Sequence, residues 1–243
     1  MTGSLSLAEL SDLFTEIGTE LDPQEEPEAV LARLTELATR RVPGAEYAGV
    51  TLGHSGQRFT TVAATDELVT RVDEIQYELN SGPCVDALLD ATTYKVGDLR
   101  TDPRWQEFGR RAVERTGIVS MLSFRLYHER NGDLITGLNM YSHQAEAFDF
   151  TSETIGLLIA THGAVVAERA EAQQKAQNLA VALQNSREIG VAMGILMNAG
   201  RITKDQAFDL LRIASQHTHR KLAEIAAEVA QTGLLPAVPN RRS

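Results

Sequence analysis

Cationic and ionisable side chains gather in the stretch SQHTHRKLAEIA (215–226), near the end of an otherwise acidic chain. His217, His219, Arg220 and Lys221 fall within five residues, between two apolar repeats. Positive side chains beside a helix amino terminus bind phosphate groups, because the unpaired backbone N–H groups and the cations act together. The stretch therefore predicts a phosphate-binding corner; a solvated charged turn is the alternative.

Charge is distributed unevenly along the 243 residues, whose formal net charge is -10. Residues 1–186 contain 15 Lys and Arg against 28 Asp and Glu, a net charge of -13. Residues 187–243 contain 8 against 5, a net charge of +3. A basic tail on an acidic body suggests an anionic partner for the tail.

Three helices are expected to position the cationic stretch. The run IGVAMGILM (189–197) ends the first helix, Thr203 and Gln206 form a capping box that opens the second, and Thr218 is expected to cap the third, which ends at Gly233. Apolar residues recur at i, i+3, i+4 and i+7 in both later helices. They are Ala207, Leu210, Leu211 and Ala214, and then Leu222, Ile225, Ala226 and Val229.

The candidate nucleic-acid contacts lie at the junction of the second and third helices and on the first helix. At the junction they are Arg212, Ser215, His217, Thr218, Arg220 and Lys221. Ala192 and Gly194 are small residues on the first helix, where a glycine costs about 1 kcal/mol relative to alanine. Such small residues allow an RNA backbone or another helix to approach closely. Packing against another helix is the simpler of these two explanations. Met193, Leu196 and Met197 are expected in the core.

The residues before this unit alternate between helical and strand periodicity, which predicts an α+β domain with a largely antiparallel sheet. Hairpin turns are expected at 55–57 and 131–132. The predicted helices cover 5–21, 27–42, 67–79, 85–91 and 102–117. The predicted strands cover 46–54, 58–66, 94–99, 118–128 and 134–142.

A long helix is expected between the two parts, from an N-cap at Thr151, with Phe150 and Ile155 as a hydrophobic staple, to a C-cap at Gly200. Its heptad a/d pairs predict a short or imperfect coiled coil and a homodimer, with a solvated single helix as the alternative. The pairs are Ile155/Leu158, His162/Val165, Arg169/Ala172, Ala176/Leu179 and Leu183/Ser186.

Composition narrows the function classes. A single cysteine, Cys84, excludes an internal disulfide and a dithiol redox cycle within one chain. His54, His128 and His143 are scattered, so we expect no structural metal, and no cofactor is predicted. The amino terminus lacks a signal peptide pattern and no long apolar run predicts a membrane span, so we expect a cytoplasmic protein. Without an assignable nucleophile or carboxylate pair, we do not expect an enzyme.

Two families resemble parts of the chain. The motifs IGVAMGILM, ITKDQAFDLLRIASQHTHRKLAEIAAEV and TGLLP resemble the ANTAR family of RNA-binding antitermination domains. The motifs SGPCVDALLD, DPRWQEFGRRAVERTGIVSMLSFRLY and GLNMYS resemble GAF sensory domains. The expected organisation is a GAF-like sensor over 1–167, a helical connector or coiled coil over 168–186, and a three-helix ANTAR domain with a short tail over 187–243.

The resemblance implies a signal-responsive regulator that binds paired RNA hairpins and so prevents a terminator from forming. Recognition of loop bases agrees with the general use of unstacked bases in RNA readout. Many members have Lys where this chain has Met193, and His219 stands where an amide or a cation is expected. A GAF pocket between sheet and helices implies an unknown small-molecule ligand, with Cys84, Trp105 and Asn139 as candidate walls. The alternatives are a DNA-binding regulator, a protein-binding sensory scaffold and a GAF-type methionine sulfoxide reductase, a reaction that needs a second, resolving thiol.

Overall fold

A computed structural model describes residues 6–54, 58–90, 92–128 and 134–236 of the chain. It divides into two compact units, Met1–Gln174 and Lys175–Ser243, which are treated separately below. The turns expected at 55–57 and 131–132 lie outside the described residues.

The first unit has the predicted α+β fold, with a five-stranded sheet in the order β2-β1-β5-β4-β3 and antiparallel neighbours throughout. The strands are β1 (Tyr47–His54), β2 (Arg58–Ala64), β3 (Thr93–Val96), β4 (Ser120–His128) and β5 (Leu134–Ser142). The helices are α1 (Leu7–Glu20), α2 (Pro27–Arg41), α3 (Glu67–Leu79), α4 (Pro83–Asp90), the 3-10 turn η1 (Pro103–Trp105), α5 (Gln106–Thr116) and the first part of α6 (Phe150–Gly200). The helix predicted from residue 102 therefore begins with a 3-10 turn.

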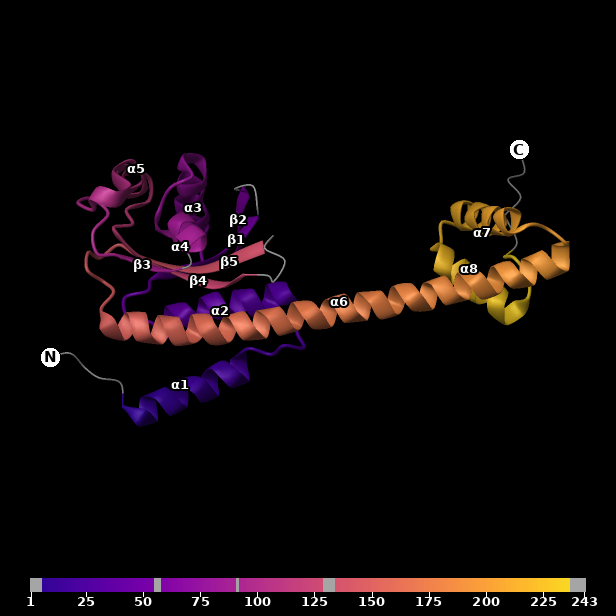
Figure 1. The fold of residues 1–243 in the computed structure, drawn as a ribbon, viewed down its shortest axis with the longest axis horizontal. Helices are drawn as coiled ribbons and strands as arrows, with labels where there is room; N and C mark the ends of the chain where they lie inside the picture. Colours follow the sequence, from indigo (N-terminus) through magenta and orange to yellow (C-terminus); the bar gives the residue numbers. More distant parts are fainter. Residues whose placement is uncertain (1–5, 55–57, 91, 129–133, 237–243) are drawn as a thin grey trace. The chain divides into compact units, whose positions relative to one another are not determined.

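Helices cover both faces of this sheet (Figure 1). α2 and α6 lie on one face, with α1 beneath them, and α3, α4 and α5 lie on the other. Successive strand residues point to opposite faces. On β5, Leu138 and Met140 therefore join the α2/α6 core, whereas Tyr141 joins the core under α3 and α5.

The N-cap predicted for the long helix is wrong by two residues. The Asp149 carboxylate accepts a hydrogen bond from the Ser152 backbone N–H at 2.9 Å, and the Ser152 hydroxyl accepts one from the Asp149 backbone N–H at 3.2 Å. Asp149 therefore caps α6 in place of Thr151. The expected staple is also absent, because Phe150 is 73% exposed while Ile155 is buried.

Glycines let α6 approach the rest of the first unit closely. A Cβ added at Gly156 would lie 2.6 Å from a ring carbon of Phe124, and one at Gly163 would lie 2.3 Å from Leu34 Cδ1. Both neighbours are fully buried. The two glycines are seven residues apart, so they lie on the same face of the helix, which packs against α2 and the sheet.

The second unit contains the end of α6, α7 (Lys204–Thr218) and α8 (Leu222–Thr232) around a small core. The capping box of Thr203 and Gln206 is confirmed. The core consists of Ala192, Met193, Leu196, Ala207, Leu211, Ala214, Ile225, Ala226 and Val229. Leu210 and Met197, both expected in this core, are exposed at its border.

Two of the predicted caps in this unit are also wrong. α6 ends at Gly200 with the left-handed conformation at Arg201, whose φ is 50°. Thr218 is the last residue of α7, where its hydroxyl donates to the Ala214 carbonyl at 2.7 Å. The N-cap of α8 is Lys221, while Gly233 closes the helix as expected.

One helix in the described part of the chain is long and apolar enough to cross a membrane by length and composition alone. It is α6, in which a window of 18 residues has a mean hydropathy of 1.3. A single helix of this kind is weak evidence for a membrane span, because core helices of other proteins meet the same criteria; 44% of the window is buried inside the protein.

The surroundings of Gly163 in α6 and Gly18 in α1 predict opposite effects when each is replaced by alanine. Gly163→Ala should destabilise the first unit by about 1 kcal/mol net, because overpacking against Leu34 costs roughly 1–3 kcal/mol and exceeds the gain in helix propensity. Gly18→Ala in α1 has nothing within 4 Å of the new Cβ and should stabilise by up to about 1 kcal/mol. Urea unfolding followed by Trp105 fluorescence measures both. A Gly163→Ala protein as stable as wild type would contradict this account of α6 packing.

Candidate functional site

The turn between α7 and α8 holds part of the predicted corner together. His219 ends α7 in the left-handed conformation, with φ of 55°, which reverses the chain. The Ser215 hydroxyl donates to the Arg220 carbonyl at 2.6 Å, and the Arg220 N–H donates to the Ser215 carbonyl at 3.3 Å. Ser215, Thr218, Arg220 and Lys221 are therefore neighbours in one ordered turn.

The arginines of the predicted corner are already paired with carboxylates. Arg220 Nη1 lies 2.6 Å from Glu228 Oε2, and its Nε lies 3.7 Å from Glu224 Oε2. The hydrogen bond to Glu228 raises the pKa of Arg220. Arg212 lies 3.0 Å from Asp209, on its own helix. These pairs reduce the positive potential that the sequence suggests.

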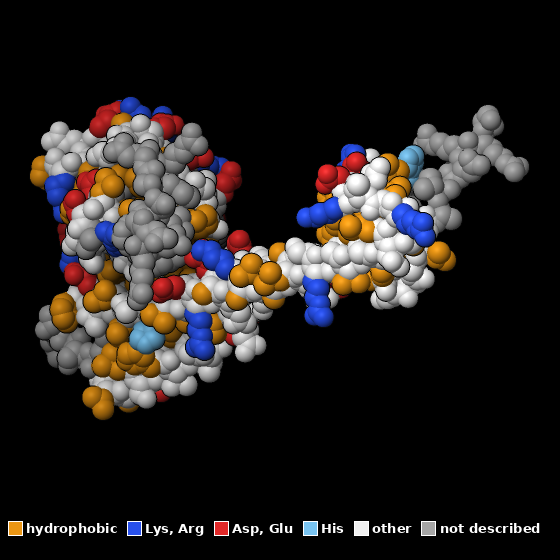
Figure 2. Space-filling model, turned by 45° about the vertical axis from the view of Figure 1, so that its right-hand side comes forward, with side chains coloured by type: hydrophobic (Ala, Val, Ile, Leu, Met, Phe, Trp, Pro, Cys, Tyr) orange, Lys and Arg blue, Asp and Glu red, His pale blue; other side chains and the backbone are white. Residues whose placement is uncertain are grey.

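The described cations of the second unit do not form one patch on the face drawn in Figure 2. Its Lys and Arg side chains stand apart there, with hydrophobic side chains between them. Lys221 and His217 are exposed near the α7–α8 turn. Lys221 supplies no side-chain cap to α8, so its own side chain does not occupy the first backbone N–H groups of that helix.

The two small residues of the first helix differ in environment. Ala192 is fully buried among the core residues of the second unit, which supports the packing alternative. Gly194 is exposed, and a Cβ there would meet nothing within 4 Å among the described residues. Met193, where many ANTAR sequences have Lys, is buried. Of these three positions, only Gly194 is exposed.

The first unit contains a buried polar network on the α3/α4 face of its sheet. Asp73 accepts hydrogen bonds from the Tyr141 hydroxyl, from Thr61 Oγ1 at 2.8 Å and from Gln76 Nε2 at 3.2 Å. The Tyr77 hydroxyl lies 2.9 Å from Thr61 Oγ1 and continues the network. This network was missed from the sequence.

The network continues to two of the candidate ligand residues. The Tyr77 hydroxyl lies 2.9 Å from Thr51 Oγ1. Asn139 Nδ2 donates to Thr51 Oγ1 and to Cys84 Sγ, both at 3.0 Å. Cys84 and Asn139 are therefore in contact, and both are buried. Trp105 lies elsewhere, donating from Nε1 to Asp86 Oδ2 at 2.6 Å beneath the Arg104 guanidinium.

Burial controls the protonation of this network. Desolvation raises the pKa of Asp73 to about 6, although its hydrogen bonds act in the opposite direction. Burial, with the charge of Asp73, also raises the pKa values of Cys84 and Tyr77. A thiol held protonated is a poor nucleophile, so Cys84 is suited to packing and hydrogen bonding.

Three buried side-chain oxygens lack a hydrogen-bond partner among the described residues. They are Ser123 Oγ, Thr136 Oγ1 and Asn139 Oδ1. Ser123 pairs with Asn139 across β4 and β5, so these two side chains are neighbours on the α3/α4 face. Unpartnered buried polar atoms are uncommon, and such a pair suits a bound water or a small polar ligand.

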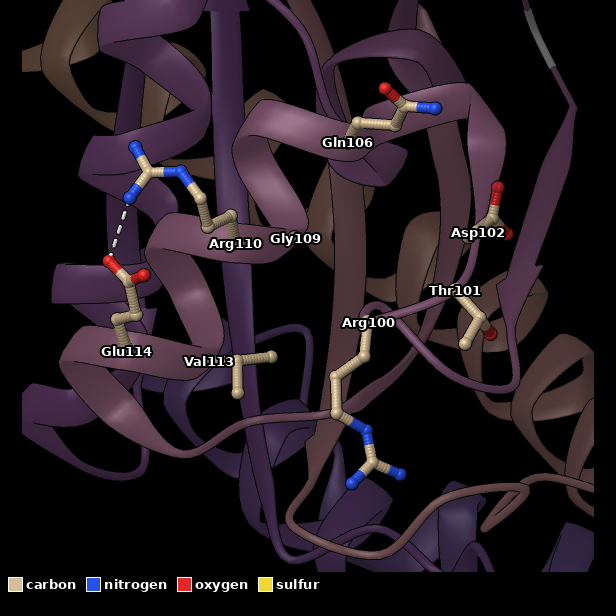
Figure 3. Close-up of a pocket in the computed structure, with 8 residues that line it drawn as sticks. All are labelled: Arg100, Thr101, Asp102, Gln106, Gly109, Arg110, Val113 and Glu114. Atoms are coloured by element: carbon tan, nitrogen blue, oxygen red, sulfur yellow. Dashed lines mark hydrogen bonds and ion pairs between the residues drawn. The ribbon is translucent and has the colours of Figure 1, made fainter.

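A hollow of about 440 Å³ lies on the surface beside α5 (Figure 3). Its arginines are neutralised locally: Arg110 pairs with Glu107 and Glu114, and Arg100 with Asp98. This arrangement offers no unpaired cation to an anionic ligand, so we do not assign the hollow a site.

One signal in the sequence could have revealed the network. Asp73 and Gln76 occupy the i+4 and i+7 positions of a helical face that begins with Val69 and Val72. A carboxylate and an amide on the buried face of a predicted helix need partners within the fold. The identity of those partners depends on strands far along the chain.

The buried carboxyl group predicts a pH dependence of stability. Because the folded pKa of about 6 lies above the ordinary value of 3.8, Asp73 contributes stability that is full below about pH 4 and is lost as pH rises through 6. Two pH units correspond to about 3 kcal/mol. The difference in unfolding free energy between wild type and Asp73→Asn should therefore fall by roughly that amount from pH 4 to pH 7.5. Urea unfolding followed by Trp105 fluorescence measures it, with Glu74→Gln, on the exposed face of the same helix, as the charge control. A difference independent of pH would contradict the prediction.

Two domain families match the chain, one within each of the two compact units. A GAF domain model matches residues 24–168, and an ANTAR domain model matches residues 177–229. No similar protein was found among curated sequences. The first match covers more than half of the chain, and the second covers the three-helix unit.

Solved structures with low sequence identity share the fold of the first unit. A free methionine-R-sulfoxide reductase from Neisseria meningitidis aligns with a TM-score of 0.52 and 16% identity, over 71% of this chain and 96% of that one. The GAF domain of a phosphoenolpyruvate-protein phosphotransferase from Coxiella burnetii aligns with a TM-score of 0.53 and 14% identity, over 70% and 99%. A GAF sensor protein from Burkholderia vietnamiensis gives 0.52 and 17%, over 69% and 99%. This chain belongs to the GAF domain family and carries a carboxyl-terminal ANTAR domain, the arrangement of a sensory regulator.

Proposed function

We propose that this protein is a signal-responsive RNA-binding regulator that promotes transcription antitermination by holding paired RNA hairpins. The observation that carries the proposal is the ANTAR match over 177–229, whose α7–α8 turn is ordered and bears exposed Lys221 and His217. GAF and ANTAR domains have sensory and regulatory roles, so catalysis is not part of the proposal. Cys84, the single cysteine, is buried, which also speaks against sulfoxide reduction.

Phosphate binding is proposed at the amino terminus of α8. The first-turn N–H groups of a helix attract anions, and Lys221 stands at the N-cap beside them. Arg220 would reach a phosphate by exchanging its carboxylate partner, Glu228. Glu224 lies in the first turn of α8 and opposes an anion there, while Glu228 repels phosphates one turn further along. Both carboxylates limit non-specific binding to nucleic acid.

Homodimerisation through α6 is proposed because paired hairpins require two ANTAR domains. Three large apolar side chains in the second unit's part of α6 are more than half exposed: Leu179 at 61%, Val181 at 59% and Leu183 at 63%. Leu179 and Leu183 lie four residues apart on one face, at the predicted heptad positions. A second copy of the same helix would cover them.

RNA binding is tested by removing the two adjacent cations. Arg220→Ala with Lys221→Ala should remove about two phosphate contacts, lowering the magnitude of the log–log salt slope by roughly 1.4 for single-stranded loops. Glu228→Gln should tighten binding, because it frees Arg220 from its partner. Lys204→Ala, which removes one cation at the other end of α7, is the control for a loss of positive charge outside this corner. Filter binding to a twin-hairpin RNA and to duplex DNA at several salt concentrations measures these effects. An unchanged slope in the double variant would refute the assigned corner, and preference for duplex DNA would refute RNA as the partner.

Dimerisation is tested by placing charges on the exposed face of α6. Leu179→Asp with Leu183→Asp should give a monomer by light scattering, because an unpaired charge in an apolar interface is too costly to bury. Folding should survive, since both side chains are exposed in the single chain. Gln184→Asp, at an exposed neighbouring position outside the heptad seam, is the control. A dimer that persists in the double variant would exclude this face as the interface.

A further inference from the structure

A second cavity, of about 220 Å³, lies on the opposite face of the sheet from the Asp73 network. Its walls include Leu31 of α2, Ala167 of α6, and Leu52, Val62 and Leu126 of the strands. All lie within the first unit. An apolar cavity of roughly 150 Å³ is large enough for benzene, so this one admits a substituted benzene ring or an alkyl group of similar size.

A buried hydroxyl group lines this cavity. Thr136 of β5 lies among the lining residues, is only 2% exposed, and its Oγ1 has no hydrogen-bond partner among the described residues. Strand alternation places Thr136 on the same face as Leu138 and Met140, which belong to the apolar core. Leaving such a hydroxyl unpaired costs about 1–3 kcal/mol, so a ligand that supplies a partner gains affinity.

The remaining lining residues restrict the charge of the ligand. Glu28, Glu171 and Gln174 belong to the lining, from α2 and α6. Two carboxylates disfavour an anion. Gln174 also hydrogen-bonds to Glu26, which ties α6 to the start of α2 beside the cavity.

We propose that this cavity is a binding site for a small aromatic or alkyl alcohol that carries no anionic group, whose hydroxyl group pairs with Thr136 and whose apolar body contacts Leu31, Leu126 and Ala167. The site lies on the opposite side of the sheet from Cys84 and Asn139. It borders α6 at Ala167, Glu171 and Gln174, the last part of the helix within the first unit. Binding of the alcohol in this cavity does not depend on the proposed function. Control of RNA binding by the bound alcohol does rest on that function.

The test uses three fluorinated probes with the full-length chain. Titration followed by ¹⁹F NMR should show saturable one-to-one binding of 4-fluorophenol, with fluorobenzene about tenfold weaker and 4-fluorobenzoate weaker still. The tenfold ratio follows from one hydrogen bond to a buried hydroxyl. Equal affinities for 4-fluorophenol and fluorobenzene would overturn the role of Thr136, and no binding of either would overturn the site.

Matched variants locate the bound probe. Thr136→Val conserves volume and should reduce the affinity for 4-fluorophenol about tenfold while sparing fluorobenzene. Ser123→Ala also removes an unpartnered buried hydroxyl, but on the opposite face, and should leave both affinities unchanged. Ala167→Leu should abolish both by filling the cavity, with Trp105 fluorescence confirming that the variant folds. Loss of binding in Ser123→Ala with retention in Thr136→Val would place the probe on the other face and overturn the proposal.

Failure of this proposal is distinguishable from failure of the proposed function. Hairpin binding with no probe binding would remove the site and leave the RNA-binding role intact. Probe binding with no hairpin binding would leave the site intact and remove the RNA-binding role. If both occur, saturating 4-fluorophenol should change hairpin affinity in wild type and not in Ala167→Leu; an equal response in both proteins would disconnect the cavity from RNA binding.

Discussion

The close approach of α6 to α2 and the sheet is the constraint on which the first unit depends. At Gly156 and Gly163 there is no space for a Cβ, because Phe124 and Leu34 lie too close. A larger residue at either position would push the helix away from the core. Its buried positions then complete the apolar core on that face of the sheet. The GAF match ends at residue 168, close to the point where this buried stripe ends at Ala170. The cavity beside Thr136 lies where the same stretch of α6 passes over the sheet.

The two faces of the sheet have different chemistry because strand residues alternate between them. One face carries Leu138 and Met140 under α2 and α6; the other carries Asn139 and Tyr141 within a hydrogen-bonded network around Asp73. A buried carboxyl group with several donors is costly to disturb, which makes the network a rigid part of the domain. The face under α2 and α6 is lined mainly by apolar side chains, which suits an apolar ligand. The sheet of the GAF domain thus has a rigid, hydrogen-bonded face under α3 and an apolar face under α6, the helix that continues into the second unit.

In the second unit, small side chains and paired charges act together. Ala192, Ala207, Ala214 and Ala226 are all buried, so the three helices pack closely with few residues. The arginines expected to bind phosphate are held by carboxylates in the free protein. Binding to RNA would exchange one set of charge-assisted contacts for another, and the net affinity would depend on loop bases as much as on phosphates. On the proposed function, loop-base contacts would therefore compensate for the modest net charge of the unit.

The sequence by itself determined the order and type of nearly all elements, because they follow from local periodicity and turn residues. Helix 67–79, strand 134–142 and the Thr203–Gln206 capping box were predicted as they occur. The motifs also indicated both families. Caps at Thr151 and Thr218 were wrong because several polar residues compete at each helix start, and the backbone conformation selects among them. Tertiary structure alone decided the Asp73 network and the cavity at Thr136. Residues of the network lie up to 88 positions apart, as in the contact of Asn139 with Thr51, and the cavity walls come from α2, the strands and α6. Only the folded domain brings them together.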